Sequence, residues 1–395
     1  MKRFGHHIKT LYLLAIGVLF QSQAKAETID PLVYMDSVEF SLITCSPHEE
    51  IYSLYGHSAL RVRDLHRGHE EDIAFNWGVF NYQTPYFVPR FILGLTDYEL
   101  GISPFQAFCK YYRHWGSAVM EQVLDLTSEE KLRLHFALKE NYQPANRVYR
   151  YNYFYDNCST RPRDMVERSV NGSVVYAQRE DYEPTFREII HENAAHHRWT
   201  LFGIDMLLGL KADLKTSREE QEFLPANMLY DFDHAQVSDE KGNLRPLVKK
   251  RLLPVSPGVQ AIDDDVPVTP TVCAVGMLLL SLAFFLLEWS RRKTFKYWDA
   301  FLMLLLGLPG CVLTVMIFSQ HPTTSLNLQL LLVNPVHLFF LPAVLRRRKT
   351  RYWLLLAIMV VLYGLGAFFQ HYAEGMLILA SCLLLRIWIN IKNEK

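Results

Sequence analysis

The chain has 395 residues, with 41 Lys and Arg against 41 Asp and Glu, so its formal net charge is zero. This balance, without a basic tail or a low-complexity run, argues against a protein that binds nucleic acid through a polybasic surface. Half of the residues are hydrophobic, and their distribution separates a soluble part from a membrane part.

Residues 1–26 have the features of a signal peptide. Basic residues follow the first methionine, residues 11–20 form an apolar run, and an Ala-Lys-Ala motif ends at residue 26. The apolar run is too short to span a bilayer. The mature chain is therefore expected to begin near Glu27, outside the cytoplasm.

Residues 27–265 have the composition of a soluble domain with one substantial core and a helical appendage. His57 opens a short predicted strand over residues 57–63. A second alternating stretch over residues 72–79 places Asn76 on its polar side. If these two strands pair, His57 and Asn76 share one face of the sheet.

Residues 85–100 are aromatic and aliphatic and include Tyr86, Phe87 and Phe91. They form either an exposed apolar lip or a part of the domain core. An enzyme whose substrate carries an acyl chain would need such a lip near the bilayer.

Cys158 lies between an aromatic stretch at 149–155 and a helix predicted over 160–168, which carries an early proline. The unpaired backbone N–H groups and the positive dipole at a helix start favour a thiolate and lower the pKa of a thiol. A buried, inert cysteine is the plainer alternative. The polar neighbours of Cys158, however, do not suit an apolar core.

A nucleophilic thiol needs a base, and His57 is the best candidate. Asn76 can hold the imidazole in one tautomer, so Cys158, His57 and Asn76 are the predicted catalytic residues of a Cys-His-Asn enzyme. Two alternatives stay open: Asp72 could replace Asn76, and His57 could be a structural histidine bonded to a backbone carbonyl. The histidine precedes the cysteine, which is the reverse of the order in papain.

No metal and no cofactor are expected. His191, His196 and His197 lack carboxylate or cysteine partners at a metal-ligand spacing. In an oxidising compartment Cys45 and Cys109 could form a disulfide, which would leave Cys158 as the free thiol of this domain.

Residues 266–395 form the predicted membrane part. Five apolar segments are each about as long as a span requires: 272–289, 298–318, 326–345, 353–370 and 375–391. The loops 290–297 and 346–351 are rich in Lys and Arg, and the alternating loops contain neither, so the basic loops are expected in the cytoplasm. The large domain then lies outside and the C-terminus inside.

Three polar residues inside these segments need an explanation. Asn334 is expected to satisfy backbone groups freed by Pro335. His337 could line a path for substrate or proton. Arg386, near the cytoplasmic end of the last segment, is expected to extend its charge to the membrane surface.

Several runs resemble the Lnb N-terminal periplasmic domain, most specifically Gly-His-Ser at 56–58 and Asp-Asn-Cys-Ser-Thr-Arg at 156–161. The resemblance extends to the membrane helices with their Asn-Pro pair. Members of that family are similar to circularly permuted papain-like proteins related to NlpC-type amidases and lecithin-retinol acyltransferases. The resemblance thus implies an α+β fold, a permuted papain-like periplasmic domain followed by a five-helix transmembrane bundle.

The resemblance also implies lipoprotein N-acylation at the bacterial inner membrane. An acyl chain would pass from a phospholipid to the N-terminal amine of a diacylated lipoprotein cysteine, through a thioester on Cys158 with His57 as general base. The implied partners are the membrane, the phospholipid donor and the lipoprotein acceptor. Two alternatives remain: a membrane-tethered cysteine peptidase or amidase acting on cell-envelope peptides, and a non-catalytic envelope binding module.

Overall fold

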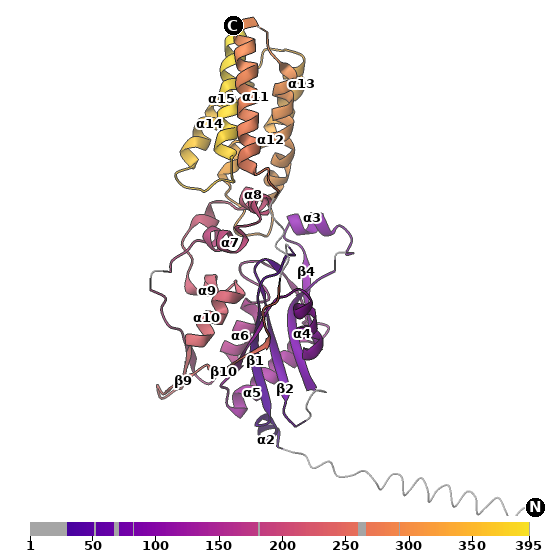
Figure 1. The fold of residues 1–395 in the computed structure, drawn as a ribbon, viewed down its shortest axis with the longest axis vertical. Coiled ribbons are helices and arrows are strands. Elements are labelled where there is room, and N and C mark those ends of the chain that lie inside the picture. Colours follow the sequence, from indigo (N-terminus) through magenta and orange to yellow (C-terminus); the bar gives the residue numbers. More distant parts are fainter. Residues whose placement is uncertain are drawn as a thin grey trace, which may run out of the picture.

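A computed structural model describes residues 30–394, except 51–52, 67–70, 82, 181, 260–265 and 292. The predicted signal peptide and its cleavage site lie outside the described residues. Figure 1 shows an elongated molecule with a sheet-containing domain at one end and a helical bundle at the other. The expected mixed α and β domain followed by apolar helices is therefore confirmed.

The soluble domain is built on a seven-stranded antiparallel sheet in the order β10-β5-β1-β2-β3-β4-β6. Its strands are β1 Val38–Cys45, β2 His57–Asp64, β3 Asp72–Val79, β4 Asp97–Pro104, β5 Val119–Leu124, β6 Val148–Arg150 and β10 Val248–Val255. β2 pairs with β3 through Leu60↔Phe75 and Arg61↔Ala74. The predicted pairing of the His57 strand with the Asn76 strand is thus confirmed.

Helices cover both faces of this sheet. Leu42, Leu60 and Trp77 lie in one apolar core, on the side of α5 Ser128–Asn141, α6 Thr160–Ser169 and α10 Pro225–His234. Ile43, Ala59 and Ala74 form a second core with α4 Phe105–His114 on the other side. This alternation buries every second strand residue on each face.

The remaining described elements of the soluble domain are short. They are α2 Pro31–Met35, α3 Phe87–Ile92, α7 Phe186–Ala194, α8 Arg198–Leu207, η3 Leu210–Asp213, α9 Arg218–Gln221, and a small sheet of β7 Ser173–Val175, β8 Gln236–Ser238 and β9 Leu244–Pro246. α7, α8 and η3 share an apolar cluster with the aromatic segment that precedes Cys158. The helices α7, α8 and η3 are therefore packed beside the segment that leads to Cys158.

The bundle consists of α11 Pro270–Arg291, α12 Lys296–Met316, η4 Leu328–Leu331, α13 Val336–Leu345, α14 Tyr352–Gly366 and α15 Met376–Glu394. Within the described chain, four segments are long and apolar enough to cross a membrane: Pro270–Arg291, Lys296–Met316, Leu328–Leu345 and Met376–Asn393. The predicted fourth segment, 353–370, contains the apolar helix α14 of 15 residues. By helix length alone, four of the five predicted spans are present.

The prediction for Arg386 is wrong. Its guanidinium is fully buried in the bundle, where it binds Glu288 of α11 at 2.5 Å and Asp299 of α12 at 2.7 Å. Asn390 also donates a hydrogen bond to Asp299. Two carboxylates from neighbouring helices replace the water that a charge near a membrane surface would otherwise seek.

Asn334 and His337 both bind groups of the protein itself. Asn334 accepts a hydrogen bond from the backbone N–H of Val336 at the start of α13, in line with its expected role. His337 is buried, with its Nε2 at 2.8 Å from the Leu332 carbonyl and its Nδ1 at 2.7 Å from the Tyr352 hydroxyl. Because both ring nitrogens are bonded, His337 joins α13 to α14 instead of lining an open path.

Polar side chains of the bundle hold the soluble domain through the end of α8. Asn327 donates to the Met206 carbonyl at 2.8 Å, Gln329 to the Asp205 carbonyl at 2.7 Å and Gln370 to the Leu208 carbonyl at 3.1 Å. These carbonyls belong to the last turn of α8 and to Leu208, the residue that follows it, where backbone acceptors have no partner inside the helix. We call this set of contacts the α8 seat.

Candidate active site

A hydrogen-bonded turn presents Cys158 directly before α6. Asn157 accepts hydrogen bonds from the backbone N–H groups of Ser159 and Thr160 at 2.7 and 3.0 Å. Its amide donates to the carbonyls of Tyr153 and Phe223 at 2.8 Å each. The predicted position of Cys158 at a helix start is confirmed, and Asn157 is a positioning residue that the sequence did not single out.

The two strands bring His57 and Asn76 together. His57 Nε2 lies 2.5 Å from Asn76 Oδ1. Because that oxygen can only accept, Nε2 carries the ring proton and Nδ1 is left for the thiol. The side chain of Cys158 is hydrogen-bonded to His57. The three predicted residues therefore meet at one end of the sheet, and Cys158 is half-buried there rather than sealed.

Neighbouring residues fix the distance between the cysteine helix and the histidine strand. The hydroxyls of Ser58 and Ser159 are 3.1 Å apart, and each of these serines follows a candidate catalytic residue.

Gly78 has a φ of +98°, and a Cβ added there would lie 3.9 Å from both Cys158 and His57. Gly56 has a φ of +76°, and an added Cβ would lie 2.6 Å from the Cys45 carbonyl oxygen. Glycine at 56 is thus required by both conformation and space.

Electrostatics favours a charged pair. Burial opposes ionisation of Cys158, but the charge of His57, its hydrogen bond and the backbone N–H of Ser58 together lower the pKa of the thiol. For His57, burial acts to lower the pKa, whereas Cys158 and the hydrogen bond to Asn76 raise it, and the net effect is a raised pKa. These opposite shifts favour a thiolate beside an imidazolium.

The alternative third residue, Asp72, is occupied elsewhere. Its carboxylate binds Arg61 Nε and Nη2 at 2.7 Å each, and Arg61 Nη1 binds Glu121 at 2.7 Å. The Arg61 guanidinium also lies 3.8 Å from the centre of the Phe105 ring. This buried ion cluster lies on the same face of the sheet as His57, and its ion pairs join β2, β3 and β5. Charged residues at strand positions 61, 72 and 121 were the signal that could have revealed it.

Tyr112 of α4 forms one wall beside His57. Its ring is nearly parallel to the imidazole, at 16° and with 6.4 Å between ring centres. Its side chain is hydrogen-bonded to Cys45, which pairs with His57 across β1 and β2.

Cys45 and Cys109 are both free buried thiols, so the disulfide considered from the sequence is not formed in this structure. Burial raises the pKa of both thiols.

Of the three histidines for which the sequence predicts no metal, His191 binds a carboxylate. His191 Nε2 lies 3.0 Å from the Asp205 carboxylate, which also binds Arg187 at 2.6 Å. Within the described residues, no group of three His, Cys, Asp or Glu side chains is arranged to hold a metal ion. The backbone carbonyl of the same Asp205 is one of the acceptors of the α8 seat.

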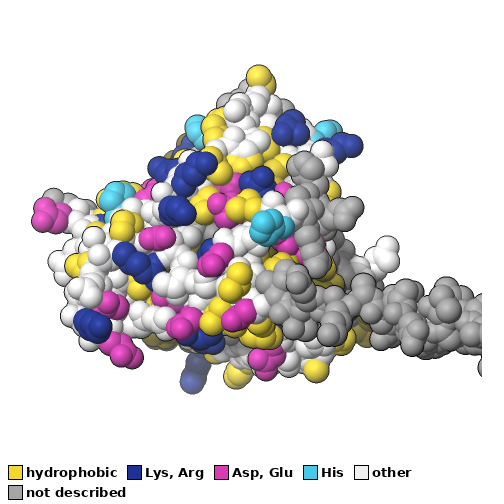
Figure 2. Space-filling view, turned by 90° about the horizontal axis from the view of Figure 1, so that it is seen from below, with side chains coloured by type: hydrophobic (Ala, Val, Ile, Leu, Met, Phe, Trp, Pro, Cys, Tyr) yellow, Lys and Arg dark blue, Asp and Glu magenta, His cyan; other side chains and the backbone are white. Residues whose placement is uncertain are grey.

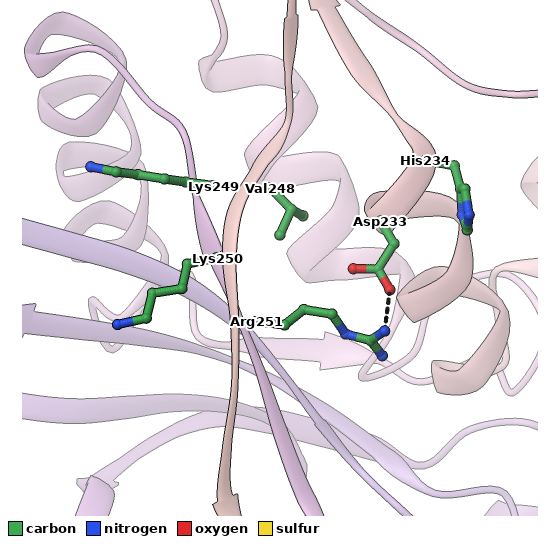
Figure 3. A pocket seen from close by; sticks show the side chains of 6 residues that line it. All are labelled: Asp233, His234, Val248, Lys249, Lys250 and Arg251. Atoms are coloured by element: carbon green, nitrogen blue, oxygen red, sulfur yellow. Dashed lines mark ion pairs between the residues drawn. The ribbon is translucent and has the colours of Figure 1, made fainter.

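An open depression of about 430 Å³ lies away from this site, between α10 and β10 (Figure 3). Its lining includes Lys249, Lys250 and Arg251, and Arg251 binds Asp233 at 3.1 Å. β10 is an edge strand separated from β2 by β5 and β1. Charges on an edge strand prevent pairing with other chains. The basic residues that line this depression are therefore explained without a ligand.

Comparison with known protein families places both the soluble part and the membrane part of the chain in one family. Residues 26–192 match the Lnb N-terminal periplasmic domain, and residues 262–395 match the Lnb transmembrane domain. Neither the curated proteins nor the solved structures contain a match to the chain. The two domains indicate an inner-membrane protein with a periplasmic N-terminal domain and suggest a membrane-associated lipoprotein-modifying enzyme. The chain belongs to the Lnb family.

Proposed function

We propose that this protein is a lipoprotein N-acyltransferase that uses Cys158 as its nucleophile. It moves an acyl chain from a phospholipid to the N-terminal amine of a diacylated lipoprotein cysteine. The observation that carries the proposal is the hydrogen-bonded group of Cys158, His57 and Asn76, in a domain that the α8 seat holds against apolar membrane helices. A thiol enzyme held at a membrane is well placed to act on lipid esters.

In the first step the Cys158 thiolate attacks the carbonyl carbon of a phospholipid ester. The acyl C–O bond breaks, His57 gives its proton to the leaving glycerol oxygen, and a lysophospholipid departs. The N–H groups of Ser159 and Thr160 are taken by Asn157. The backbone N–H groups of Ser58 and Cys158, which bind the sulfur, are therefore the nearest donors for the carbonyl oxygen.

In the second step the lipoprotein amine attacks the thioester carbon. Neutral His57 takes a proton from the amine, the C–S bond breaks, and Cys158 leaves as a thiolate. The products are an amide and the original thiolate and imidazolium pair. Asn76 keeps the imidazole in the orientation that both steps need.

We further propose that the fold is a circularly permuted papain-like domain, which the order of strand histidine and helix cysteine supports. The domain boundaries are 1–26, 27–265 and 266–395. α14 completes a fifth span together with the residues that follow it, which puts the C-terminus in the cytoplasm. The basic loops 290–297 and 346–351 support this orientation.

The test is intact mass spectrometry of an N-terminal lipoprotein peptide from cells whose only copy of the protein is Cys158→Ala. We expect the peptide to lose one acyl chain, while cells with Cys311→Ala, a cysteine exposed on α12, keep it. An identical triacylated peptide in all strains would refute the proposal. It would leave the peptidase or amidase alternative, in which water is the acceptor.

A further inference from the structure

α3 leaves apolar side chains uncovered where the soluble domain meets the bundle. Tyr86 is 81% exposed, Val88 64% and Phe91 46%, and α3 has no buried residue. A cluster of large exposed apolar side chains marks a contact surface. We call Tyr86 together with α3 the α3 lip. Within the segment 85–100, the structure therefore gives the exposed form for the lip, whereas Tyr98 and Leu100 lie in the domain core.

The lip is fastened to the connection that follows α12. The N–H of Gln320 donates to the Leu93 carbonyl at 2.9 Å, and His321 Nε2 donates to the Phe91 carbonyl at 2.9 Å. Phe318, two residues before Gln320, is 80% exposed. Figure 1 shows α3 projecting sideways from the sheet at the height of α8, beside the end of the bundle. The lip is therefore level with the end of a membrane helix, where Phe318 is also exposed.

Basic side chains beside the lip fit a lipid headgroup. Arg90 and Arg150 share one carboxylate, that of Asp97, at 2.9 and 2.8 Å. Arg150 also donates to Gln320 at 3.1 Å. One positive charge is left over next to the apolar face, which is the arrangement of an interfacial element that meets anionic phosphates.

The opposite end of the soluble domain has another character. Figure 2 shows basic and acidic side chains interspersed there, with apolar side chains in small groups between them. Such a mixed surface is typical of a face turned to water. The exposed apolar surface of the lip is thus not repeated on the face that Figure 2 shows.

Behind the lip, a row of aromatic rings leads toward Cys158. Ring centres are 6.4 Å apart for Phe91 and Phe87, 6.1 Å for Phe87 and Phe80, 4.8 Å for Phe80 and Tyr98, and 4.2 Å for Tyr98 and Tyr151. All four pairs are stacked. Tyr151 and Cys158 are both half-buried and pack against the same apolar core. The row therefore ends close to the nucleophile.

We propose that the α3 lip inserts into the outer leaflet of the inner membrane, and that the aromatic row behind it guides a phospholipid acyl chain to Cys158. The insertion is argued from the lip alone, whereas the guidance of the acyl chain rests on the proposed acyl transfer. Tyr98 is itself buried in the core, so the surface offered to the chain is formed by the half-buried rings of Phe87, Phe80 and Tyr151. Aromatic rings make such a surface rigid and tolerant of chain length.

The first test uses photocrosslinking of the full chain in membranes that contain labelled phospholipid. The photoreactive residue p-benzoylphenylalanine replaces Tyr86 in one sample and Phe136 of α5, which is 59% exposed, in a matched control. We expect a lipid adduct at 86 and none at 136. Equal labelling of both positions, no adduct at 86, or an adduct with a protein there would overturn the insertion.

The second test compares Val88→Asp with Phe136→Asp for thioester formation on Cys158. We expect Val88→Asp to slow the reaction with phospholipid vesicles at least about 10-fold more than the reaction with a soluble short-chain ester. Phe136→Asp should leave both rates unchanged. An equal loss with both donors would refute guidance by the lip. If the wild-type chain forms no thioester with either donor while position 86 still labels lipid, the acyl transfer is wrong and the insertion stands.

Discussion

At the scale of single residues, the proposed activity depends on two side chains whose pKa values move in opposite directions. The pKa of Cys158 is lowered and that of His57 is raised. The thiolate forms as pH rises through the first value, and the imidazolium is lost as pH rises through the second. The charged pair is therefore confined to the pH range between them.

The first prediction follows from this range. Single-turnover thioester formation should have a bell-shaped dependence on pH. Asn76→Ala removes a hydrogen bond that raises the pKa of His57, so the alkaline limit should move to lower pH. The maximal rate should fall by less than the roughly 10²–10⁴-fold loss expected from removing the base itself. A profile that matches that of the exposed control Asn146→Ala would mean that Asn76 does not position His57.

Gly56 allows a second prediction at this scale. Gly56→Ala should lower the free energy of unfolding by about 1–3 kcal/mol, because L side chains rarely adopt a φ of +76° and the Cys45 carbonyl occupies the space. Gly203→Ala in α8 is the control, since an added Cβ there meets nothing within 4 Å. Thermal unfolding would measure both. Equal stability of the two variants would contradict the strain argument.

The candidate catalytic residues could be identified from the sequence because each carried a local signal. Alternation placed His57 and Asn76 on one face, and helix-start residues surrounded Cys158. The choice between Asn76 and Asp72 could not be made, because it depends on Arg61 and Glu121, and the latter is 60 positions away in the chain. Asn157 was missed because its bonds reach Phe223, 66 positions on.

At the scale of elements, the buried charges of the bundle join three helices. Arg386 of α15 is bonded to Glu288 of α11 and Asp299 of α12. The sequence showed only an arginine near a segment end, for which a position at the membrane surface is the usual explanation. Its partners lie 98 and 87 positions away and belong to other helices, so periodicity within one helix could not reveal them.

The third prediction concerns this charge cluster. Arg386→Leu should destabilise the bundle by about 3–5 kcal/mol, because two buried carboxylates lose their counter-charge. The triple variant Arg386→Met, Glu288→Gln and Asp299→Asn should recover most of that loss, since no net charge then remains buried. Thermal unfolding in detergent would show the order. A triple variant no more stable than the single one would count against charge burial as the cause.

At the scale of the whole molecule, the division into a soluble part and a membrane part was predictable, because apolar run length and loop charge both report it. The joint between the parts was not. The α8 seat pairs side chains of the bundle with backbone carbonyls more than 100 positions earlier in the chain. No composition or periodicity marks such acceptors.

The fourth prediction tests this joint. Gln329→Ala combined with Gln370→Ala leaves the Asp205 and Leu208 carbonyls without these donors, at a cost of about 1–3 kcal/mol each. We expect faster hydrogen exchange at the N–H groups of Gly209 and Leu210, which donate across the joint to Thr323 and Leu326. Amides of the central strands β1 and β2 provide the internal control. Unchanged exchange at 209 and 210 would show that the seat does not depend on these glutamines.

The α8 seat also has a kinetic consequence. If these contacts hold the domain to its membrane helices, the proposed enzyme presents a single site to both substrates, and the phospholipid and the lipoprotein occupy that site in turn. Under the proposed reaction, the lysophospholipid has to diffuse away before the lipoprotein amine can enter. Ping-pong kinetics then follow, and lysophospholipid that accumulates in the bilayer should act as a competitive product inhibitor of the second half-reaction.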